Sequence, residues 1–224
     1  MKQSLLEEHF FDELLSLLQV NSQPGKLINI DTIDGGGNST QAAFLCDYLR
    51  DTHGVPVILT REPTDDQIGF KIREVLQKQW QLPPVPFQLL FSADRGHHLD
   101  TLISPALERG DWVVTARYAL STLAFGMSHG IPAWQLLAMN ISYPWPNLNL
   151  VLTVSPEECL QRKVKQQGQR KLELHEVRET LEKTLEIYQL LAGLIPCTEL
   201  VDGTGTEAEV FARVQKIVDE RLLP

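Results

Sequence analysis

Cysteine is scarce in this sequence, and its placement does not favour a metal site. The 3 cysteines, Cys46, Cys159 and Cys197, are far apart in apolar contexts and form no CxxC or CxxH pair. Such spacing is typical of reduced, buried thiols, whereas disulfide frameworks and zinc sites use closely spaced cysteines. We therefore expect all three thiols to be buried and reduced, with metal binding as the less favoured alternative.

Long apolar runs and an excess of positive charge are also missing. No segment reaches the about 18 apolar residues of a membrane span, and the N-terminus lacks the basic start and cleavage site of a secretory signal. The 20 Lys and Arg residues are outnumbered by 29 Asp and Glu residues, which gives a net charge of -9. Such a chain repels nucleic acid and anionic membranes unless a local patch overrides its charge. We expect a cytoplasmic protein with no nucleic-acid or membrane partner.

The composition is that of one globular domain preceded by a helical extension. The 224 residues are 43% hydrophobic and 22% charged, which suffices for a sizeable core. Within residues 1–25, paired apolar residues recur between Leu5 and Leu18 with acidic residues between them, and this pattern predicts an amphipathic helix. We expect its apolar face to dock on the domain's own sheet. Pairing with a second subunit, which would make a homodimer, is the alternative.

Apolar runs and helical spacing alternate along residues 26–224. The apolar runs predict strands at 27–33, 55–60, 112–115, 148–154 and 197–201. Helices are predicted at 41–49, 69–79, 87–109, 119–128, 134–142, 173–192 and 206–222, and a capping box at Ser155 and Glu158 begins another. This alternation predicts an α/β fold in which helices flank a parallel five-stranded sheet.

A glycine-rich turn joins the first predicted strand to the first predicted helix of this domain. Residues 31–41 read DTIDGGGNSTQ. Such a turn directs several backbone N–H groups and a helix N-terminus at one spot, which favours a polyphosphate. The usual pattern is Gly, four residues, then Gly-Lys-Ser/Thr. Here Thr32 stands at the first glycine and Asn38 at the lysine, while Ser39 keeps the hydroxyl that binds magnesium.

Three further motifs follow in order, and together with the loop they carry a family resemblance. They are Thr-Arg-Glu-Pro at 60–63, Phe-Ser-Ala-Asp-Arg at 91–95, and Ala-Leu-Glu-Arg-Gly-Asp-Trp-Val-Val-Thr-Ala-Arg-Tyr at 106–118. From about Leu27 to the C-terminus the chain resembles the thymidylate kinase family. The resemblance implies a three-layer fold of the P-loop NTPase type. It also implies transfer of the ATP γ-phosphate to dTMP or a related nucleoside monophosphate, with Mg²⁺.

The resemblance also assigns roles to individual residues. Phe91 stacks on the acceptor base, Arg95 hydrogen-bonds that base, and Arg117 holds the acceptor phosphate. Magnesium is assigned to Ser39. The full set for the donor phosphates is Gly35, Gly36, Gly37, Asn38, Ser39 and Thr40, and the full set for the acceptor is Asp34, Arg61, Glu62, Phe91, Arg95 and Arg117. His97 and His98 diverge as neighbours on a helix, and we interpret them as incidental.

A basic stretch stands out in this acidic chain. Its cations and one glycine are Arg162, Lys163, Lys165, Gly168, Arg170 and Lys171, with no acid between them. By position it corresponds to the mobile lid, at about 162–174, that closes over the donor phosphates in nucleoside monophosphate kinases. The resemblance makes Arg170 and Lys171 catalytic together with Arg117. A solvated basic helix face is the alternative.

Several family positions are altered, and the alterations leave two functions open. Asn38 cannot replace the charge of a lysine, Ala116 stands where the family has Asp, and Phe125-Gly126 replaces Tyr-Gln beside the base. Thr32 is β-branched and resists the φ > 0 conformations that glycine permits. The first hypothesis is a nucleoside monophosphate kinase with weakened or altered chemistry. The second is a catalytically degenerate protein that binds nucleotide or acts as a scaffold.

Overall fold

The sheet has five parallel strands, as predicted. The computed structural model describes residues 2–167 and 174–223, and the side chains of residues 9–164 and 178–223. The strands lie in the order β2-β3-β1-β4-β5, and every pair is parallel. Their bounds are Leu27–Asp31 (β1), Val57–Arg61 (β2), Trp112–Ala116 (β3), Leu148–Thr153 (β4) and Thr198–Asp202 (β5). The central strands are largely apolar because both of their faces are buried, although each also contains a buried polar residue, namely Asn29, Thr115 or Asn149.

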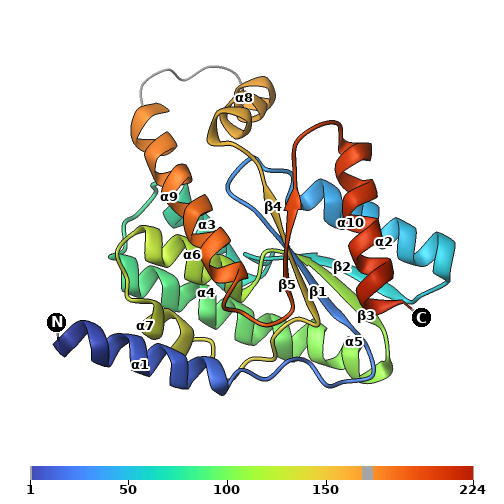
Figure 1. Ribbon diagram of the computed structural model, residues 1–224, viewed down its shortest axis with the longest axis horizontal. Coiled ribbons are helices and arrows are strands. Elements are labelled where there is room, and N and C mark those ends of the chain that lie inside the picture. Colours follow the sequence, from blue (N-terminus) through green and yellow to red (C-terminus); the bar gives the residue numbers. More distant parts are fainter. Residues whose placement is uncertain (1, 168–173, 224) are drawn as a thin grey trace.

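Helices cover both faces of the sheet and complete a three-layer fold (Figure 1). One face packs on α2 (Asn38–His53) and α10 (Glu207–Leu222), and the other on α5 (Ser104–Arg109), α6 (Ala119–Ser128) and α9 (Leu174–Ala192). Successive strand residues point to opposite faces. Ile28 and Ile30 of β1 therefore join the α2 and α10 core, whereas Val113 and Val151 join the other one. This arrangement confirms the predicted α/β fold class.

The long helix predicted at 87–109 is interrupted. The structure has α4 (Pro84–His98), then a π-helical turn at Leu99–Ile103, then α5. Pro105 in the first turn of α5 has no N–H to donate, so the regular bonding pattern changes just before it. Elsewhere α3 (Gln67–Leu76) and α7 (Ala133–Ala138) are shorter than predicted, and α8 (Pro156–Gln167) begins after Ser155. The Ser155 hydroxyl accepts from the Glu158 N–H at 3.3 Å.

The N-terminal helix α1 (Lys2–Ser16) docks on its own domain, as predicted (Figure 1). The prediction that it docks on the sheet is wrong, because α1 packs on helix α7. The rings of Phe10 and Trp134 of α7 meet edge to face, with centroids 5.7 Å apart. Phe11 and Leu14 pack against the core. The sheet face is already covered by α5, α6 and α9, so α1 adds to the outside of the helical layer. Pairing with a second subunit stays a prediction.

The prediction of three buried thiols is wrong for one of them. Cys46 and Cys159 are buried, and burial raises their pKa values to about 12 and about 11, respectively. Such thiols are largely protonated near neutral pH and are poor nucleophiles. Cys197 is exposed, because it lies in a left-handed turn (φ 55°) just before the edge strand β5.

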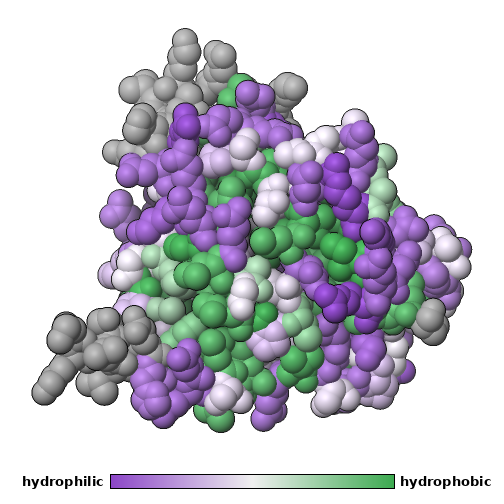
Figure 2. All heavy atoms as spheres, viewed as in Figure 1, coloured by the Kyte–Doolittle hydropathy of each residue, from purple (hydrophilic) through white to green (hydrophobic). Residues whose placement is uncertain are grey.

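Hydrophobic side chains also reach the surface along this edge. Figure 2 shows them in the middle of the face in view, over β5 and the adjoining end of α9. The exposed leucines here are Leu190 of α9, Leu194 in the turn after it and Leu200 of β5. Across the described parts of the chain, none of the helices combines the length and the apolar character that crossing a membrane requires.

Candidate active site

The glycine loop lies between the carboxyl end of β1 and the first turn of α2. Gly35 and Gly37 have φ angles of 93° and 98°, which place them in the left-handed region that favours glycine. Gly37 is the N-cap of α2, and Ser39 is exposed in its first turn. The loop therefore presents backbone N–H groups and the positive end of the α2 dipole at one spot. Geometry of this kind suits a phosphate.

Thr32 does not strain the loop, contrary to the expectation from its β-branched side chain. The described non-glycine residues with positive φ are Lys78, Arg117 and Cys197, so Thr32 is outside that region. Its buried hydroxyl donates to the carbonyl oxygen of Leu152 at 2.8 Å. A Cβ atom at Gly36 would lie 2.1 Å from Oγ1 of Thr32. The left-handed positions are supplied by Gly35 and Gly37, and Gly36 makes room for Thr32.

Helix α8 brings cations of the predicted lid to the loop. Arg162 donates to the carbonyl oxygens of Gly36 and Gly203, both at 3.2 Å, and to Glu158 at 2.6 Å. Nζ of Lys163 lies 3.3 Å from Oδ2 of Asp34. Figure 1 shows α8 next to the loop that joins β1 to α2. The predicted catalytic residues Arg170 and Lys171 lie outside the described residues.

A cavity of about 660 Å³ opens beside the loop. It collects five of the six residues predicted to bind the acceptor, namely Asp34, Glu62, Phe91, Arg95 and Arg117. Apolar side chains line much of the rest, including Phe87, Phe125 and Leu181. The Phe87 and Phe91 rings meet edge to face at 5.1 Å. An apolar cavity with a few charged groups suits a base joined to a phosphate.

Arg95 is held by a buried polar cluster. It donates to Glu62 at 2.6 Å, to Asn140 and to Thr122 at 3.3 Å, and it lies over the Tyr118 ring. Its Nε–H has no partner among the described residues. Since an unpaired buried donor is costly, a ligand in the cavity can supply the missing acceptor. The polar side of this cavity is therefore fixed before a ligand binds.

His98 belongs to this cluster, so its interpretation as incidental is wrong. Its Nδ1 lies 3.3 Å from Glu62, and its Nε2 lies 2.7 Å from the Thr60 hydroxyl. The side chain is buried. His98 thus orients Glu62, the carboxylate that pairs with Arg95. His97, one position earlier in the helix, is exposed.

Arg117 has a left-handed backbone (φ 77°), which is uncommon for a residue with a side chain. Its guanidinium donates to Asp34 at 2.7 Å and to the Ser121 hydroxyl at 3.3 Å, and it lies over the Phe125 ring. Burial lowers the pKa of Arg117, but Asp34, Tyr188 and Asp31 outweigh that effect and raise it. Burial raises the pKa of Asp34, but Arg117 and Lys163 outweigh that effect and lower it. The Arg117 guanidinium therefore stays positively charged and the Asp34 carboxylate stays negatively charged.

Behind Arg117 lies a buried carboxylate that sequence reasoning missed. Asp31 accepts from Ser121, from the Tyr188 hydroxyl at 3.0 Å and from Asn29 at 2.8 Å. Burial raises the pKa of Asp31, although Arg117 and these hydrogen bonds act in the opposite direction. The sequence offered one signal, an Asp at the end of a buried strand. Its partner Tyr188 comes from α9, at a separation of 157 positions.

Comparison with known proteins shows the family of this chain. Residues 30–201 match the family described as Thymidylate kinase. The chain belongs to the thymidylate kinase family. It is 32% identical over 203 residues to the thymidylate kinase of Caldicellulosiruptor saccharolyticus, an alignment that covers 88% of this chain and 98% of that protein. It is 35% identical over 173 residues to the thymidylate kinase of Desulfotalea psychrophila, covering 77% of this chain and 85% of that protein. The predicted family and the P-loop type of fold are thereby confirmed.

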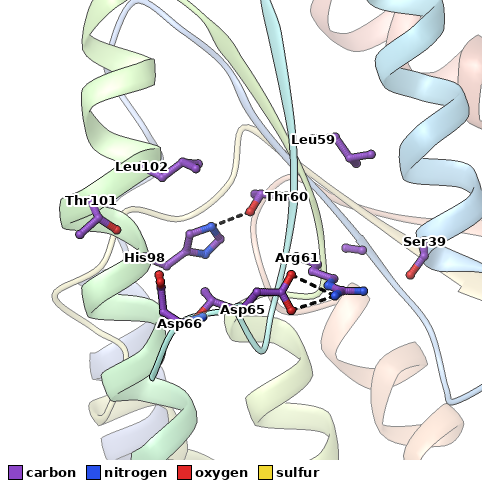
Figure 3. A pocket seen from close by; sticks show the side chains of 11 residues that line it. Ser39, Leu59, Thr60, Arg61, Asp65, Asp66, His98, Thr101 and Leu102 are labelled. Atoms are coloured by element: carbon purple, nitrogen blue, oxygen red, sulfur yellow. Dashed lines mark hydrogen bonds and ion pairs between the residues drawn. The ribbon is translucent and has the colours of Figure 1, made fainter. Parts of the chain in front are cut away.

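Arg61, the sixth residue predicted to bind the acceptor, does not line the acceptor cavity. Its side chain is 58% exposed, and its Nη2 donates to both carboxylate oxygens of Asp65, at 2.9 and 3.0 Å. It lines a second cavity, of about 570 Å³, together with Ser39, Thr60, Asp65, Asp66, His98 and Ala116 (Figure 3). The structure therefore does not bring Arg61 together with Arg95 and Arg117 around the acceptor cavity.

This second cavity contains side chains that could ligate a magnesium ion. Ser39 offers a hydroxyl and Asp66 a carboxylate, the carboxylate of Asp65 already pairs with Arg61 and Arg73, and Ala116 offers no ligand. No group of three or more His, Cys, Asp or Glu residues that could hold a metal occurs among the described residues. Magnesium is usually held by one or two carboxylates together with substrate phosphates and water. The donor set fits an ion that arrives on a nucleotide, and it does not fit a metal bound by protein groups alone.

Position 126 of this thymidylate kinase homologue does not face the acceptor cavity. A Cβ atom at Gly126 would lie 2.5 Å from the Leu136 side chain of α7. Gly126 therefore permits close packing of α6 on α7, and the replacement of Gln by Gly at this position acts on helix packing and not on the acceptor cavity. Phe125 does line the cavity.

Proposed function

We propose that this protein is a nucleoside monophosphate kinase that transfers the γ-phosphate of ATP to dTMP or a related monophosphate. The observation that carries the proposal is the Arg117–Asp34 pair, because it joins the acceptor cavity to the glycine loop. A kinase of this kind must place two phosphates next to each other. A guanidinium at the boundary between the two sites can hold one of them.

The reaction needs alignment and positive charge more than covalent work by the protein. An oxygen of the acceptor phosphate attacks the γ-phosphorus of ATP, the bond to the bridging oxygen breaks, and ADP leaves with that electron pair. We assign the donor phosphates to the glycine loop from Gly35 to Thr40, through its backbone N–H groups other than that of Gly36, which already donates to the carbonyl oxygen of Ile33 at 3.0 Å. We assign the acceptor phosphate to Arg117 and the acceptor base to Phe91 and Arg95. Ser39 would hold magnesium. The ion, when bound, neutralises charge on the transferring phosphates.

We infer that turnover is weakened. Asn38 adds no charge to the loop, and Ala116 adds no carboxylate beside Ser39. A missing electrostatic contact to the transition state commonly lowers kcat by about 10²–10³. The acceptor side keeps Arg95 and Arg117, so we expect a nucleoside monophosphate to bind more tightly than ATP. Calorimetric titration with each ligand tests this order, and tight ATP binding without monophosphate binding contradicts it.

A coupled assay of ADP release tests the activity itself. Purified protein is given ATP, Mg²⁺ and each nucleoside monophosphate in turn, and we expect the highest rate with dTMP. The Arg117→Met variant, purified in the same way, controls for a contaminating kinase because it lacks the acceptor guanidinium. Equal rates for the wild type and this variant would count against the proposal.

A catalytically degenerate nucleotide-binding or scaffolding protein is the second candidate. The substitutions at positions 38 and 116 favour it, since both fall on phosphate chemistry. Nucleotide binding without ADP release from any monophosphate would select this candidate. A cytoplasmic location and a homodimer remain part of the proposal, and sedimentation of the purified protein tests the homodimer.

A further inference from the structure

The glycine loop has backbone donors but no cation at the position where the pattern has lysine. Asn38 is half-buried and begins α2. Its amide is neutral, so it can hydrogen-bond a phosphate oxygen without compensating the charge of that oxygen. A cation near this loop must therefore come from another element.

Helix α8 is packed directly against the loop. A Cβ atom at Gly35 would lie 2.8 Å from the carbonyl oxygen of Cys159 and 3.2 Å from Cγ of Lys163. The aliphatic stem of Lys163 thus runs along the loop. Its side chain is 34% exposed, so the ammonium end can reach solvent or a ligand.

The two cations of α8 at this loop differ in their partners. Arg162 is bound to three acceptors, the carboxylate of Glu158 and the carbonyl oxygens of Gly36 and Gly203. These contacts fix α8 to the loop. Lys163 pairs at 3.3 Å with Asp34, which is itself exposed and already pairs with Arg117. An ammonium on a flexible stem can leave such a partner for a phosphate at little cost.

We propose that Lys163 supplies, on the donor phosphates, the positive charge that Asn38 lacks. This inference rests on the proposed kinase function and names a catalytic residue for it. Through Asp34, the ammonium lies beside Arg117, at the boundary between the glycine loop and the acceptor cavity. Negative charge is largest there during transfer between two phosphates. Lysine is a compact cation with three donors, which suits such a position.

The test combines neutralisation with relocation of the charge. We expect Lys163→Gln to lower kcat about 100-fold, and Lys163→Arg, which keeps the charge, to lower it less than about tenfold. Asn38→Lys should then restore at least about tenfold in the Lys163→Gln background but gain less in the wild type, because both lysines serve the same phosphates. Lys216→Gln is the matched control, since Lys216 is 74% exposed on α10 and 3.9 Å from Glu220.

Two results would overturn the role of Lys163 while leaving the kinase proposal intact. One is a Lys163→Gln variant with kcat within about twofold of an active wild type, and the other is an equal gain from Asn38→Lys in both backgrounds. If the wild type shows no turnover, the kinase proposal fails, and calorimetric binding of ATP with Mg²⁺ decides the role of Lys163. Binding about tenfold weaker in Lys163→Gln supports that role. Equal binding, or no binding by the wild type, overturns it.

Discussion

Nη2 of Arg117 lies 2.7 Å from Oδ1 of Asp34, and this ion pair connects two elements that the chain separates by 83 positions. Asp34 belongs to the glycine loop after β1, and Arg117 follows β3. Because β1 and β3 are neighbours in a parallel sheet, their carboxyl ends lie side by side. Ligands of such folds bind at this edge of the sheet.

Arg117 should be essential for the acceptor. Arg117→Met removes the guanidinium from the cavity, and we expect kcat/KM for the monophosphate to fall at least about 100-fold, which equals about 2.7 kcal/mol. Arg117→Lys keeps the charge but loses the planar guanidinium, so its kcat/KM should lie between those of the wild type and of Arg117→Met. Steady-state kinetics with varied acceptor checks both values. Equal kcat/KM in all three proteins would remove Arg117 from the site.

Restoring a carboxylate at position 116 should raise turnover. Ala116 lines the same cavity as Ser39, so the space beside it can accept a longer side chain. We expect Ala116→Asp to raise kcat about tenfold, and Asn38→Lys to add less. The comparison is made by ADP release at saturating substrates. Ala116→Asn has nearly the same volume without the charge and serves as the control. An equal gain from Asn and Asp would show that charge is not the cause.

Asn140 should act on the acceptor site through Arg95. Its side chain accepts from Arg95 and donates to the carbonyl oxygen of Leu136 at 2.8 Å. Asn140→Ala leaves a buried guanidinium nitrogen without this acceptor, which costs about 1–3 kcal/mol of stability. We also expect a several-fold higher KM for the acceptor with a smaller change in kcat. Asn140→Asp keeps an acceptor for Arg95 and should preserve the KM better, a contrast that a general loss of stability would not produce.

Asp31 should make stability depend on pH. Its pKa is raised above 3.8, so the folded protein keeps this proton to a higher pH than the unfolded chain does. The free energy of unfolding therefore falls as the pH rises from about 3.8 through the raised pKa. Asp31→Asn cannot ionise and should lack this fall. Urea unfolding between pH 4 and pH 7 compares the two, with Asp100→Asn on the exposed surface as the control. Parallel curves for all three proteins would contradict the assignment.

The strands and the acceptor motifs could be predicted because their signals are local. The buried parallel strands are largely apolar runs, and Phe91, Arg95 and Arg117 lie in short motifs. Arg61 also lies in a motif, yet it is the last residue of β2, which is an edge strand. The order of the strands depends on the whole sheet, so it could not be predicted from residues 60–63. The motif therefore could not show that Arg61 faces a different cavity.

The polar residues that support the site could not be predicted, since each depends on a distant partner. Asn140 and Arg95 are 45 positions apart, and Tyr188 and Asp31 are 157 apart. In the sequence, nothing marks Asn140 or Tyr188 as the partner of a residue so far away. The docking of α1 on α7 could not be predicted either, because it also depends on a partner far away in the sequence. An amphipathic pattern shows that a face will be covered, but the covering surface is set by which helices already occupy the sheet.

The contact between Thr32 and Gly36 imposes an order on evolutionary change in the loop. Thr32 is β-branched, and its hydroxyl is tied to Leu152, so it cannot turn away from a new side chain at position 36. While Thr32 is present, even Gly36→Ala would produce a steric clash. A smaller residue at position 32 must come first, because it removes the Thr32 atoms that a Cβ at position 36 would meet. The same two substitutions are thus permitted in one sequence of events and forbidden in the other.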